Sequence, residues 1–413
     1  MEINKTIFAN CMFVKSCTTL IVFLAIQQGA LLFAQSELNP IQTAVPFLTF
    51  TPDGRSGALG DVGVASSPDL HAQNWNAAKY AFIENNWGIA ASYTAGLPAL
   101  INNSKHFYLS GYKRLNNKQV IGGSFRFFTL GKSVVQISGS EIMPYEFAID
   151  IGYSRLLSDN LSGGVILRYI HSDLTRNANT GGADKIIGRA IAGDLSFYYQ
   201  SKEINLIGMK IYQGFGMNIS NIGNKISYTT KSDKAFLPTN LRIGGALTLE
   251  INDNNAIALM ADLNKLLVPT PPIYAVDSLG QIIMDKNGEK VIEYGMDPNV
   301  SLPISMIHSF YDAPGVLMND GTRSVWREEL NEITVGFGLE YRYRGKIALR
   351  GGYFHEHESK GNRKYFTIGT GLKIYVFELD ISYLIPTTSN SPYKGAFIIT
   401  LGFEFGDKNK CFR

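Results

Sequence analysis

Hydrophobic and polar residues alternate along much of the chain after Trp87, with the period of two that is typical of β-strands. About fourteen such strand-like segments lie between Trp87 and Phe405. The segments 145–154 and 332–344 alternate clearly, and segment 107–113 does so until Lys113 falls on its apolar face. A strand with one apolar face and one mixed face suits a wall with lipid outside and a lumen inside. In the last strand, the apolar face carries Phe397, Ile399, Leu401, Phe403 and Phe405.

The gaps between these segments alternate between tight turns and long connections. Outer-membrane barrels have short periplasmic turns, long extracellular loops and an even strand count. The sequence therefore predicts an all-β fold, a transmembrane antiparallel β-barrel of about fourteen strands over residues 87–413. The predicted turns are 116–117, 158–160, 201–203, 252–255, 344–345 and 376–377, and the predicted loops are 95–104, 130–144, 172–187, 220–240, 267–331, 356–363 and 386–394.

Composition alone does not distinguish this chain from a soluble protein. Of its 413 residues, 45% are hydrophobic and 18% are charged, because lipid-facing and lumen-facing residues average out along a barrel strand. The 12% of aromatic residues suits interface girdles. A net charge of +3 without a basic cluster does not indicate a nucleic-acid partner.

Residues 1–34 have the pattern of a cleavable signal peptide. Lys5 and Lys15 precede the apolar run 20–34, and cleavage after Ala34 would leave Gln35 as the new N-terminus. A transmembrane anchor is the alternative, although Gln27, Gln28 and Gly29 interrupt the run. Export through a cleavable signal peptide to the bacterial outer membrane is expected, and the mature chain would keep one cysteine, Cys411.

A barrel of this size encloses a lumen too wide for wall side chains to fill. Residues 35–86 are the candidate filling, a glycine-, alanine- and asparagine-rich stretch that we expect to fold as an N-terminal hatch inside the barrel. Pairing of lumen charges, with each other or with the hatch, is one interpretation of their mixed signs, and an ion-selective pore is the other. The expected lumen charges are Glu146, Asp150, Arg168, Asp194, Arg242, Glu250, Glu340, Arg342, Arg350, Lys373, Asp380 and Glu404.

Two motifs in this N-terminal stretch carry a family resemblance. One is Arg55-Ser-Gly-Ala-Leu-Gly-Asp-Val-Gly-Val-Ala65 and the other is Asn74-Trp-Asn-Ala-Ala-Lys79. They resemble the hatch of the FadL-type outer-membrane family, which is built as a fourteen-stranded barrel with an N-terminal plug; Ala77 stands where that family usually has proline. Within that broad family, the stretches 46–55 and 74–82 resemble the PorV family of the type IX secretion system. The predicted hatch–barrel contacts are Arg55, Asp61, Asn74, Trp75, Asn76 and Lys79.

The resemblance implies protein-binding work without an enzymatic step. PorV-like proteins resemble adaptors that capture the C-terminal signal domain of cargo leaving the SprA/Sov-type translocon. They deliver that cargo to a PorU-type sortase at the surface. The implied partners are therefore these three proteins and outer-membrane lipid, and no nucleic acid or cofactor is implied.

The longest connection, residues 267–331, would do this work. A loop of this length without internal structure is unusual, and the segment 273–294 reads as a small β-meander with turns at 278–280 and 285–288. Asp297 and Pro298 read as a helix start, although Pro303 limits that helix or makes it begin later. We expect an aromatic and methionine-rich partner surface, or equally a lid over the barrel mouth, from Met306, Ile307, Phe310, Tyr311 and Trp326.

The chain offers little catalytic chemistry. The run 355–358 alternates His and Glu, so an extended strand would present no more than two of them to one ion. Asp285 opens a partial calcium-loop pattern that lacks its downstream glutamate. Nucleophile-elbow, P-loop and zinc-helix motifs do not occur in the sequence, so we predict no enzyme, no metal site and no cofactor.

Two other functions compete with the adaptor. A FadL-like channel for a hydrophobic small molecule would share the hatch and barrel, but lumen-facing Ile166, Met260 and Ile398 are few for a continuous apolar path. A purely structural barrel is the third possibility. The long loop 267–331 favours the adaptor.

Overall fold

A computed structural model describes residues 38–95, 104–131, 133–134, 141–174, 187–206, 208–228, 234–387 and 395–406. The predicted signal peptide and Cys411 lie outside these ranges, so predictions about them stay predictions.

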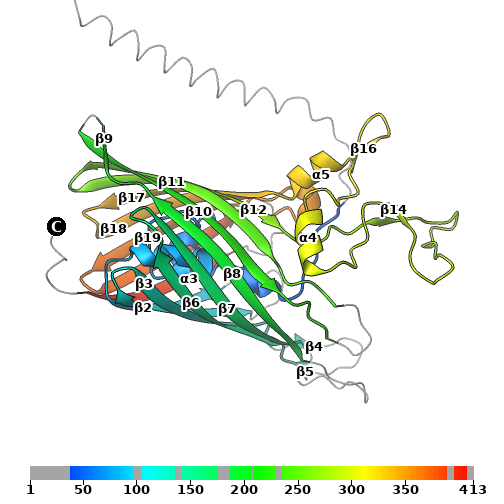
Figure 1. The fold of residues 1–413 in the computed structure, drawn as a ribbon, viewed down its shortest axis with the longest axis horizontal. Coiled ribbons are helices and arrows are strands. Elements are labelled where there is room, and N and C mark those ends of the chain that lie inside the picture. The colour runs from blue at the N-terminus through cyan, green and yellow to red at the C-terminus, as the bar shows by residue number, and fades with distance from the viewer. Residues whose placement is uncertain are drawn as a thin grey trace, which may run out of the picture.

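One antiparallel sheet forms the body of the molecule and closes on itself (Figure 1). Of its 15 strands, the short β9 (Ile204–Leu206) pairs with the start of β10, and the other fourteen form the wall. The last strand pairs with the first from Trp87↔Phe405 to Ala95↔Phe397, which confirms the predicted closed barrel. The wall strands are β1 (Trp87–Ala95), β2 (Lys105–Asn116), β3 (Gln119–Thr129), β6 (Tyr145–Leu156), β7 (Leu161–Asp173), β8 (Gly188–Gln200), β10 (Met209–Gly223), β11 (Asn240–Asn252), β12 (Asn255–Leu266), β17 (Thr334–Tyr343), β18 (Ile347–His355), β19 (Lys364–Ile374), β20 (Phe377–Pro386) and β21 (Phe397–Phe405).

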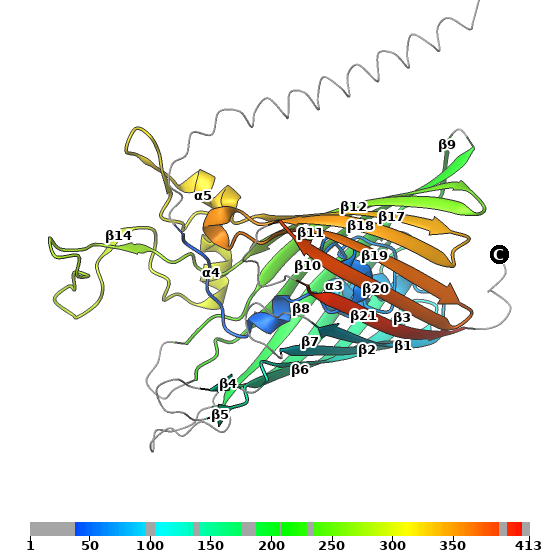
Figure 2. The same cartoon turned by 180° about the vertical axis from the view of Figure 1, so that it is seen from behind.

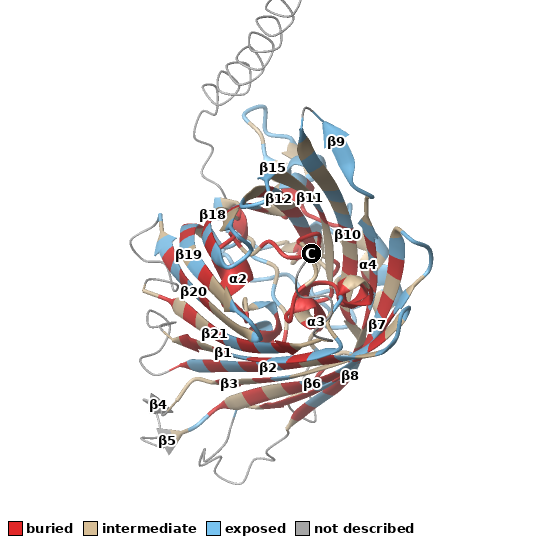
Figure 3. Cartoon of the chain, turned by 90° about the vertical axis from the view of Figure 1, so that its left-hand side faces the viewer, coloured by how far each residue is buried: buried red, intermediate tan, exposed pale blue. Residues whose placement is uncertain are grey.

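The alternating pattern separates lipid-facing from lumen-facing side chains as predicted. On β7, Val165 and Leu167 are 50% and 62% exposed, whereas Ile166 and Arg168 between and beside them are buried. Figure 3 shows the resulting stripes of buried and exposed residues along the strands. Apolar side chains therefore cover the outside of the barrel, where they would meet hydrocarbon.

Aromatic side chains gather near both ends of the outer wall, as membrane interfaces favour. Near the turns, the rings of Trp87 and Phe405 stack with centroids 4.2 Å apart. Near the loops, Tyr93 packs on Phe107, and Tyr145 stacks on His171.

Long connections leave one end of the barrel and short ones leave the other (Figures 1 and 2). One predicted tight turn is wrong. The predicted turn 201–203 does not join β8 directly to β10. Instead, the segment 204–206 forms β9 and pairs with the start of β10, so β10 pairs with β8 only from Gly214 onward. Two features favour this longer hairpin. Glu203 accepts hydrogen bonds from Asn205 and Tyr212, and the chain reverses at Gly208, which has a left-handed backbone (φ 78°).

The long loop carries its own secondary structure. The predicted meander is confirmed by β13 (Ile273–Tyr274), β14 (Ile292–Tyr294) and bridges at Val276↔Ile282 and Met284↔Lys290. Helix α4 spans Leu302–His308 with Pro303 in its first turn, so the predicted start at Asp297 is wrong and the later start is right. Asp297 instead accepts from the backbone N–H of Asn299. Strands β15 (Val316–Leu317) and β16 (Arg323–Ser324) and helix α5 (Val325–Asn331) complete the loop.

The described part of the N-terminal region, residues 38–86, which we call the N-terminal segment, lies inside the ring of strands (Figure 3). Its helices are short, of four to six residues each: η2 (Pro46–Thr49), α2 (Gly54–Gly57), α3 (Ala72–Trp75) and η3 (Ala77–Phe82). Asp53 caps α2 and Asn76 caps η3. The remaining elements are β4 (Ser133–Val134), β5 (Glu141–Ile142) and η4 (Glu358–Lys360).

No helix within the described ranges is both long enough and apolar enough to cross a bilayer.

Candidate functional site

The N-terminal segment contacts the barrel wall through inward-facing glycines. At each of these positions a Cβ atom would stand less than 3.0 Å from an atom of the segment, so a side chain there would displace the segment's backbone or one of its side chains. The contacts come from ten of the wall strands and surround the segment. These glycines are Gly88, Gly122, Gly152, Gly164, Gly214, Gly216, Gly244, Gly336, Gly338, Gly352, Gly369 and Gly402.

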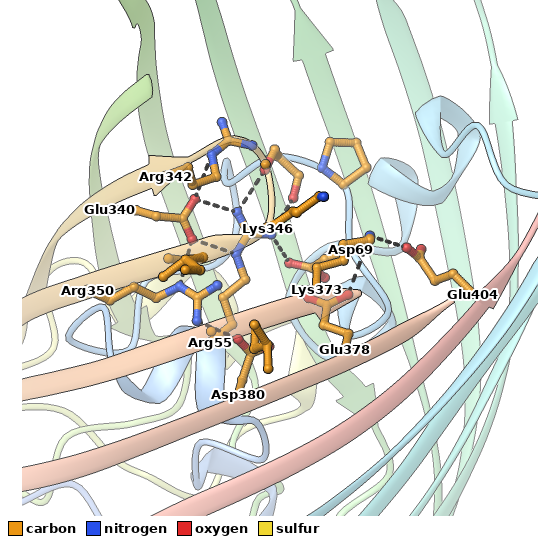
Figure 4. Close-up of a pocket in the computed structure, with 17 residues that line it drawn as sticks. Arg55, Asp69, Glu340, Arg342, Lys346, Arg350, Lys373, Glu378, Asp380 and Glu404 are labelled. Atoms are coloured by element: carbon orange, nitrogen blue, oxygen red, sulfur yellow. Dashed lines mark hydrogen bonds and ion pairs between the residues drawn. The ribbon is translucent and has the colours of Figure 1, made fainter. Parts of the chain in front are cut away.

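A buried cluster of charges connects α2 to the turn end of the lumen (Figure 4). The Arg55 guanidinium donates to the Asp69 carboxylate at 2.8 Å and to both carboxylate oxygens of Glu340 at 3.3 Å. Arg350 donates to Glu340 at 2.7 Å and to Asp380. Charges of both signs therefore pair across the lumen and with the segment, and they line a small cavity of about 130 Å³.

The other predicted contact residues divide between the wall and the segment itself. Asp61 accepts from the Tyr365 hydroxyl, and Asn74 accepts from the Arg126 guanidinium. The Asn76 amide donates to the Phe197 carbonyl at 2.8 Å.

Trp75 contacts both the wall and the segment, whereas Lys79 bonds within the segment. The Trp75 ring lies 4.6 Å from the Arg242 guanidinium on β11, and its N–H donates to Asp53 at 2.7 Å. Lys79 is fully buried and donates to the Gly63 carbonyl at 2.8 Å and to the Ser66 hydroxyl at 2.9 Å, with Asp69 at 3.7 Å. These Lys79 partners belong to the segment, not to the wall.

A second cavity of about 370 Å³ lies on the loop side of the segment. Its lining is rich in amide and charged side chains, including Asn218, Asn240, Asn264, Arg242, Arg363 and Glu332. Apolar side chains, such as Leu48, Phe50 and Phe354, make up the rest of the lining, so the cavity is mixed in character.

The long loop is fixed to the barrel rim by a buried network of ion pairs. Lys265, at the end of β12, bonds Glu329 at 2.8 Å and Glu332 at 2.7 Å. Lys360, in the loop between β18 and β19, bonds Glu328 at 2.6 Å and Glu332 at 3.0 Å. Helix α5 and the residue after it are therefore held by one lysine from a wall strand and one from a rim loop.

The N-terminal segment also contributes to this attachment. The Asn39 amide donates to Glu328 at 3.0 Å and to the Pro271 carbonyl at 3.1 Å. The described start of the chain therefore lies at the loop end of the barrel, beside the base of the long loop.

The predicted partner surface is exposed at this end. Ile307 and Trp326 are 64% and 69% exposed, and Phe310 and Tyr311 are about half exposed. Met306 is half-buried, so the surface formed by α4 and α5 presents mainly the other four residues.

The run 355–358 serves local structure. Glu356 accepts two hydrogen bonds from the Arg363 guanidinium, at 2.9 and 2.7 Å, and His357 caps η4. Across the described ranges, no three His, Cys, Asp or Glu side chains are grouped as ligands for a metal ion.

Comparison with known proteins identifies the family. The family model of the type IX secretion system protein PorV matches residues 33–273. The chain belongs to the PorV family. It is therefore an outer-membrane β-barrel of a type IX secretion family, as the sequence resemblance indicated.

Several solved structures are similar to this PorV-family chain at low identity. The toluene transporter TbuX of Ralstonia pickettii is 10% identical with a TM-score of 0.43, covering 86% of this chain and 98% of that one. The toluene transporter TodX of Pseudomonas putida is 11% identical with a TM-score of 0.42, covering 89% and 98%. A FadL homologue from Pseudomonas aeruginosa is 9% identical with a TM-score of 0.41, covering 89% and 99%. No curated protein matches the sequence.

Several wall residues that contact the segment in this PorV-family chain were not predicted from the sequence, among them Arg126, Tyr365 and Asp262. Asp262 on β12 is buried and accepts from the backbone N–H groups of Gly63 and Val64 at 2.8 and 3.0 Å. Its place on the same strand face as lumen-facing Met260 was the available signal. Asp262 also pairs with Arg242 at 3.3 Å, so it joins the segment to two adjacent strands.

Proposed function

We propose that this protein is a non-enzymatic adaptor of the type IX secretion system. It binds the C-terminal signal domain of cargo that emerges from the SprA/Sov-type translocon and delivers that cargo to a PorU-type sortase complex. The observation that carries the proposal is the exposed apolar surface of α4 and α5 on a loop that buried ion pairs fix to the barrel rim. A preorganised surface binds a partner at a smaller entropic cost than a mobile loop would.

The lumen supports a surface role over a conducting role. We propose that residues 35–86 act as a hatch that closes the barrel, since wall glycines and paired charges contact the described part of this region. The cavity left on the loop side has amide and charged side chains among its apolar ones, whereas uptake of a hydrophobic molecule needs a continuous apolar path. Work at the extracellular surface therefore fits the described residues better than transport through the lumen.

The surface can be tested with point substitutions. Ile307→Ser with Trp326→Ser removes two exposed anchors and leaves Glu328, Glu329 and Glu332 in place for the buried lysines. Deletion of 295–330 would instead remove carboxylates that Lys265 and Lys360 need. Aromatic anchors at an interface commonly contribute about 2 kcal/mol or more each, so recovery of a cargo signal domain with the purified barrel should fall by more than about tenfold.

Tyr375→Ser is the matched control, because Tyr375 is 93% exposed in a turn at the opposite end of the barrel. In cells that carry the double variant, cargo should stay in the periplasm or appear outside with its signal domain uncleaved. Normal cargo display by cells whose double variant is inserted in normal amounts would contradict the proposed surface.

A further inference from the structure

The cavity of about 370 Å³ on the loop side of the N-terminal segment, which we call the loop-side cavity, has the size of a binding site. Ligand sites in proteins typically measure about 300–1,000 Å³. Two of its lining residues, Pro46 and Thr49, are exposed, so the cavity is accessible to solvent. Its lining therefore deserves the same reading as a candidate site.

Polar side chains form a row across four neighbouring strands on the wall of this cavity. Asn218 on β10 pairs with Arg242 on β11. Arg242 pairs with Asn264 on β12, and Asn264 pairs with Thr334 at the loop end of β17. All four residues line the cavity. Strands are about 4.8 Å apart, so the row from Arg242 to Thr334 is about 10 Å long, the length of about three residues of extended peptide.

The two asparagines in this row are buried and suited to a peptide. Asn218 is 4% exposed and Asn264 is 7% exposed. The Oδ1 atom of Asn264 is buried without a hydrogen-bond partner among the described residues. A side-chain amide both donates and accepts, as a peptide group does, and a buried polar atom gains from a partner. The backbone of an extended peptide would supply such partners.

Arg242 lies between the two asparagines and is held in place by the N-terminal segment. Its guanidinium lies 4.6 Å from the centre of the Trp75 ring. One amino group, Nη1, donates to the Asp61 backbone carbonyl at 2.6 Å and to the Asp262 carboxylate at 3.3 Å. Among the described residues, Nε and the other amino group donate to no acceptor. These two donors form the planar fork that binds a carboxylate with two parallel hydrogen bonds.

The other charges that line the cavity are already engaged. The Asp61 carboxylate accepts from a tyrosine hydroxyl, and the remaining acidic groups pair with lining cations. These pairs are Glu332–Lys360 at 3.0 Å and Glu356–Arg363 at 2.7 Å. Arg242 is therefore the lining cation best placed to take a carboxylate from a ligand.

The cavity also lies beside the proposed partner surface. Glu332 lines the cavity and accepts from Lys265 at 2.7 Å. The Lys265 ammonium group in turn lies 5.8 Å from the centre of the Phe310 ring, next to helix α4. A domain bound to the surface of α4 and α5 would thus be adjacent to the cavity.

We propose that the loop-side cavity binds the carboxyl-terminal end of the cargo signal domain, about three residues in extended form. The terminal carboxylate bonds Arg242 and the Asn218 amide, and the preceding peptide groups bond Asn264 and Thr334. Apolar side chains of the ligand contact Leu48, Phe50 and Phe354, which complete the lining. This inference rests on the proposed adaptor function, because it names the part of the cargo that enters the barrel.

The first test changes the ligand and leaves the barrel intact. Calorimetry measures binding of a purified cargo signal domain to the purified mature chain in detergent. The domain is compared in three forms: with its free carboxyl end, with that end amidated, and without its last three residues. Amidation removes the charge that Arg242 binds, so it should weaken binding at least about tenfold, and loss of the three residues should weaken it further.

The second test assigns the effect to Arg242. The Arg242→Gln variant should bind the free and the amidated domain equally, because the fork is gone. Arg189→Gln is the matched control, since Arg189 is exposed on the outer face of β8 at the same end of the barrel. This control should keep the tenfold preference for the free carboxyl end. Heat-dependent mobility in gels checks that each variant is folded.

The outcomes separate this inference from the adaptor function. Equal binding of all three domain forms by the wild type would overturn the cavity site, while loss of binding in Ile307→Ser with Trp326→Ser would still support the adaptor. A tenfold preference that persists in Arg242→Gln, or disappears in Arg189→Gln, would also overturn the site. A wild type that binds no form of the domain would contradict both proposals.

Discussion

Gly216 on β10 lies directly against the backbone of Val64 in the N-terminal segment. A Cβ atom at Gly216 would stand 2.0 Å from the Val64 carbonyl oxygen, which is far inside van der Waals contact. The neighbouring Asp262 accepts from the Val64 N–H at 3.0 Å. Barrel wall and segment therefore meet here backbone to backbone, with neither able to move without breaking a buried hydrogen bond.

Gly216→Ala should displace the N-terminal segment. Overpacking of a dense contact costs typically about 1–3 kcal/mol, and the clash here is with backbone that cannot rotate away. We expect a lower unfolding temperature and greater conductance in planar bilayers, because the proposed hatch would then block the lumen less well. Gly245→Ala is the control, since its Cβ would point to lipid with 3.9 Å of room. Equal conductance of the two variants would show that the segment tolerates the added methyl group.

Arg55→Met should loosen α2 from the wall. The substitution removes the partner that Asp69 and Glu340 share, and loss of one member of a buried ion pair costs about 3–5 kcal/mol. Thermal unfolding of the variant in detergent measures the loss. Arg55→Met already removes one of the arginines that pair with Glu340, and Arg350 still pairs with it. Glu340→Gln should therefore cost less in the Arg55→Met background than in the wild type. Additive effects of the two substitutions would mean that Arg55 and Glu340 act independently.

The barrel could be predicted from the sequence because period-two alternation is a local property that each strand carries on its own. The pairing of charges is not local: Arg55 and Glu340 are separated by 285 residues, and one sequence cannot say which of several lumen charges meets which. Lys79 illustrates the limit, since its partners proved to be Gly63, Ser66 and Asp69 within the same segment.

Helix α4 illustrates a competing local signal. Two prolines, Pro298 and Pro303, each suit the first turn of a helix, and the chain uses the second. Ser305 and Ser309 of this region are buried, and Ser305 Oγ lies 3.5 Å from the Leu267 carbonyl at the base of the loop. Tertiary contacts of this kind, which sequence periodicity does not contain, decide where such a helix begins.

Lys360→Met should release the long loop without unfolding the barrel. The ammonium group of Lys360 bonds Glu328 and Glu332, and its loss leaves two buried carboxylates with fewer partners. Limited proteolysis should cut within 267–331 several-fold faster, while the barrel strands stay protected. Lys290→Met is the control, because Lys290 lies in the meander over the Tyr274 ring and away from the ion-pair network. Unchanged cleavage in Lys360→Met would mean that Lys265 alone holds α5.

Asp312 should make the same loop sensitive to pH. Burial, with a smaller contribution from nearby Glu332, raises the pKa of Asp312 from its usual 3.8 to about 6, and Thr270 and Lys265 oppose this shift. Its Oδ1 atom is buried without a hydrogen-bond partner in the described structure, so a proton there removes the cost of an unpaired buried charge. Burial also raises the pKa of Glu329, which acts in the same direction.

The sign of this effect follows from proton linkage. The folded loop binds a proton more tightly than an opened loop does, so folding of the loop gains free energy as the pH falls from above 6 towards 4, on the order of 1–3 kcal/mol. Hydrogen exchange around residues 309–316, corrected for the intrinsic rate, should therefore be slower at pH 5 than at pH 8. Asp312→Asn cannot lose that proton, so it should give the slower exchange at both pH values. If the wild type instead opened more readily at pH 5, the ion pairs of Lys265 and Lys360 would dominate the loop's response, because their carboxylates weaken on protonation.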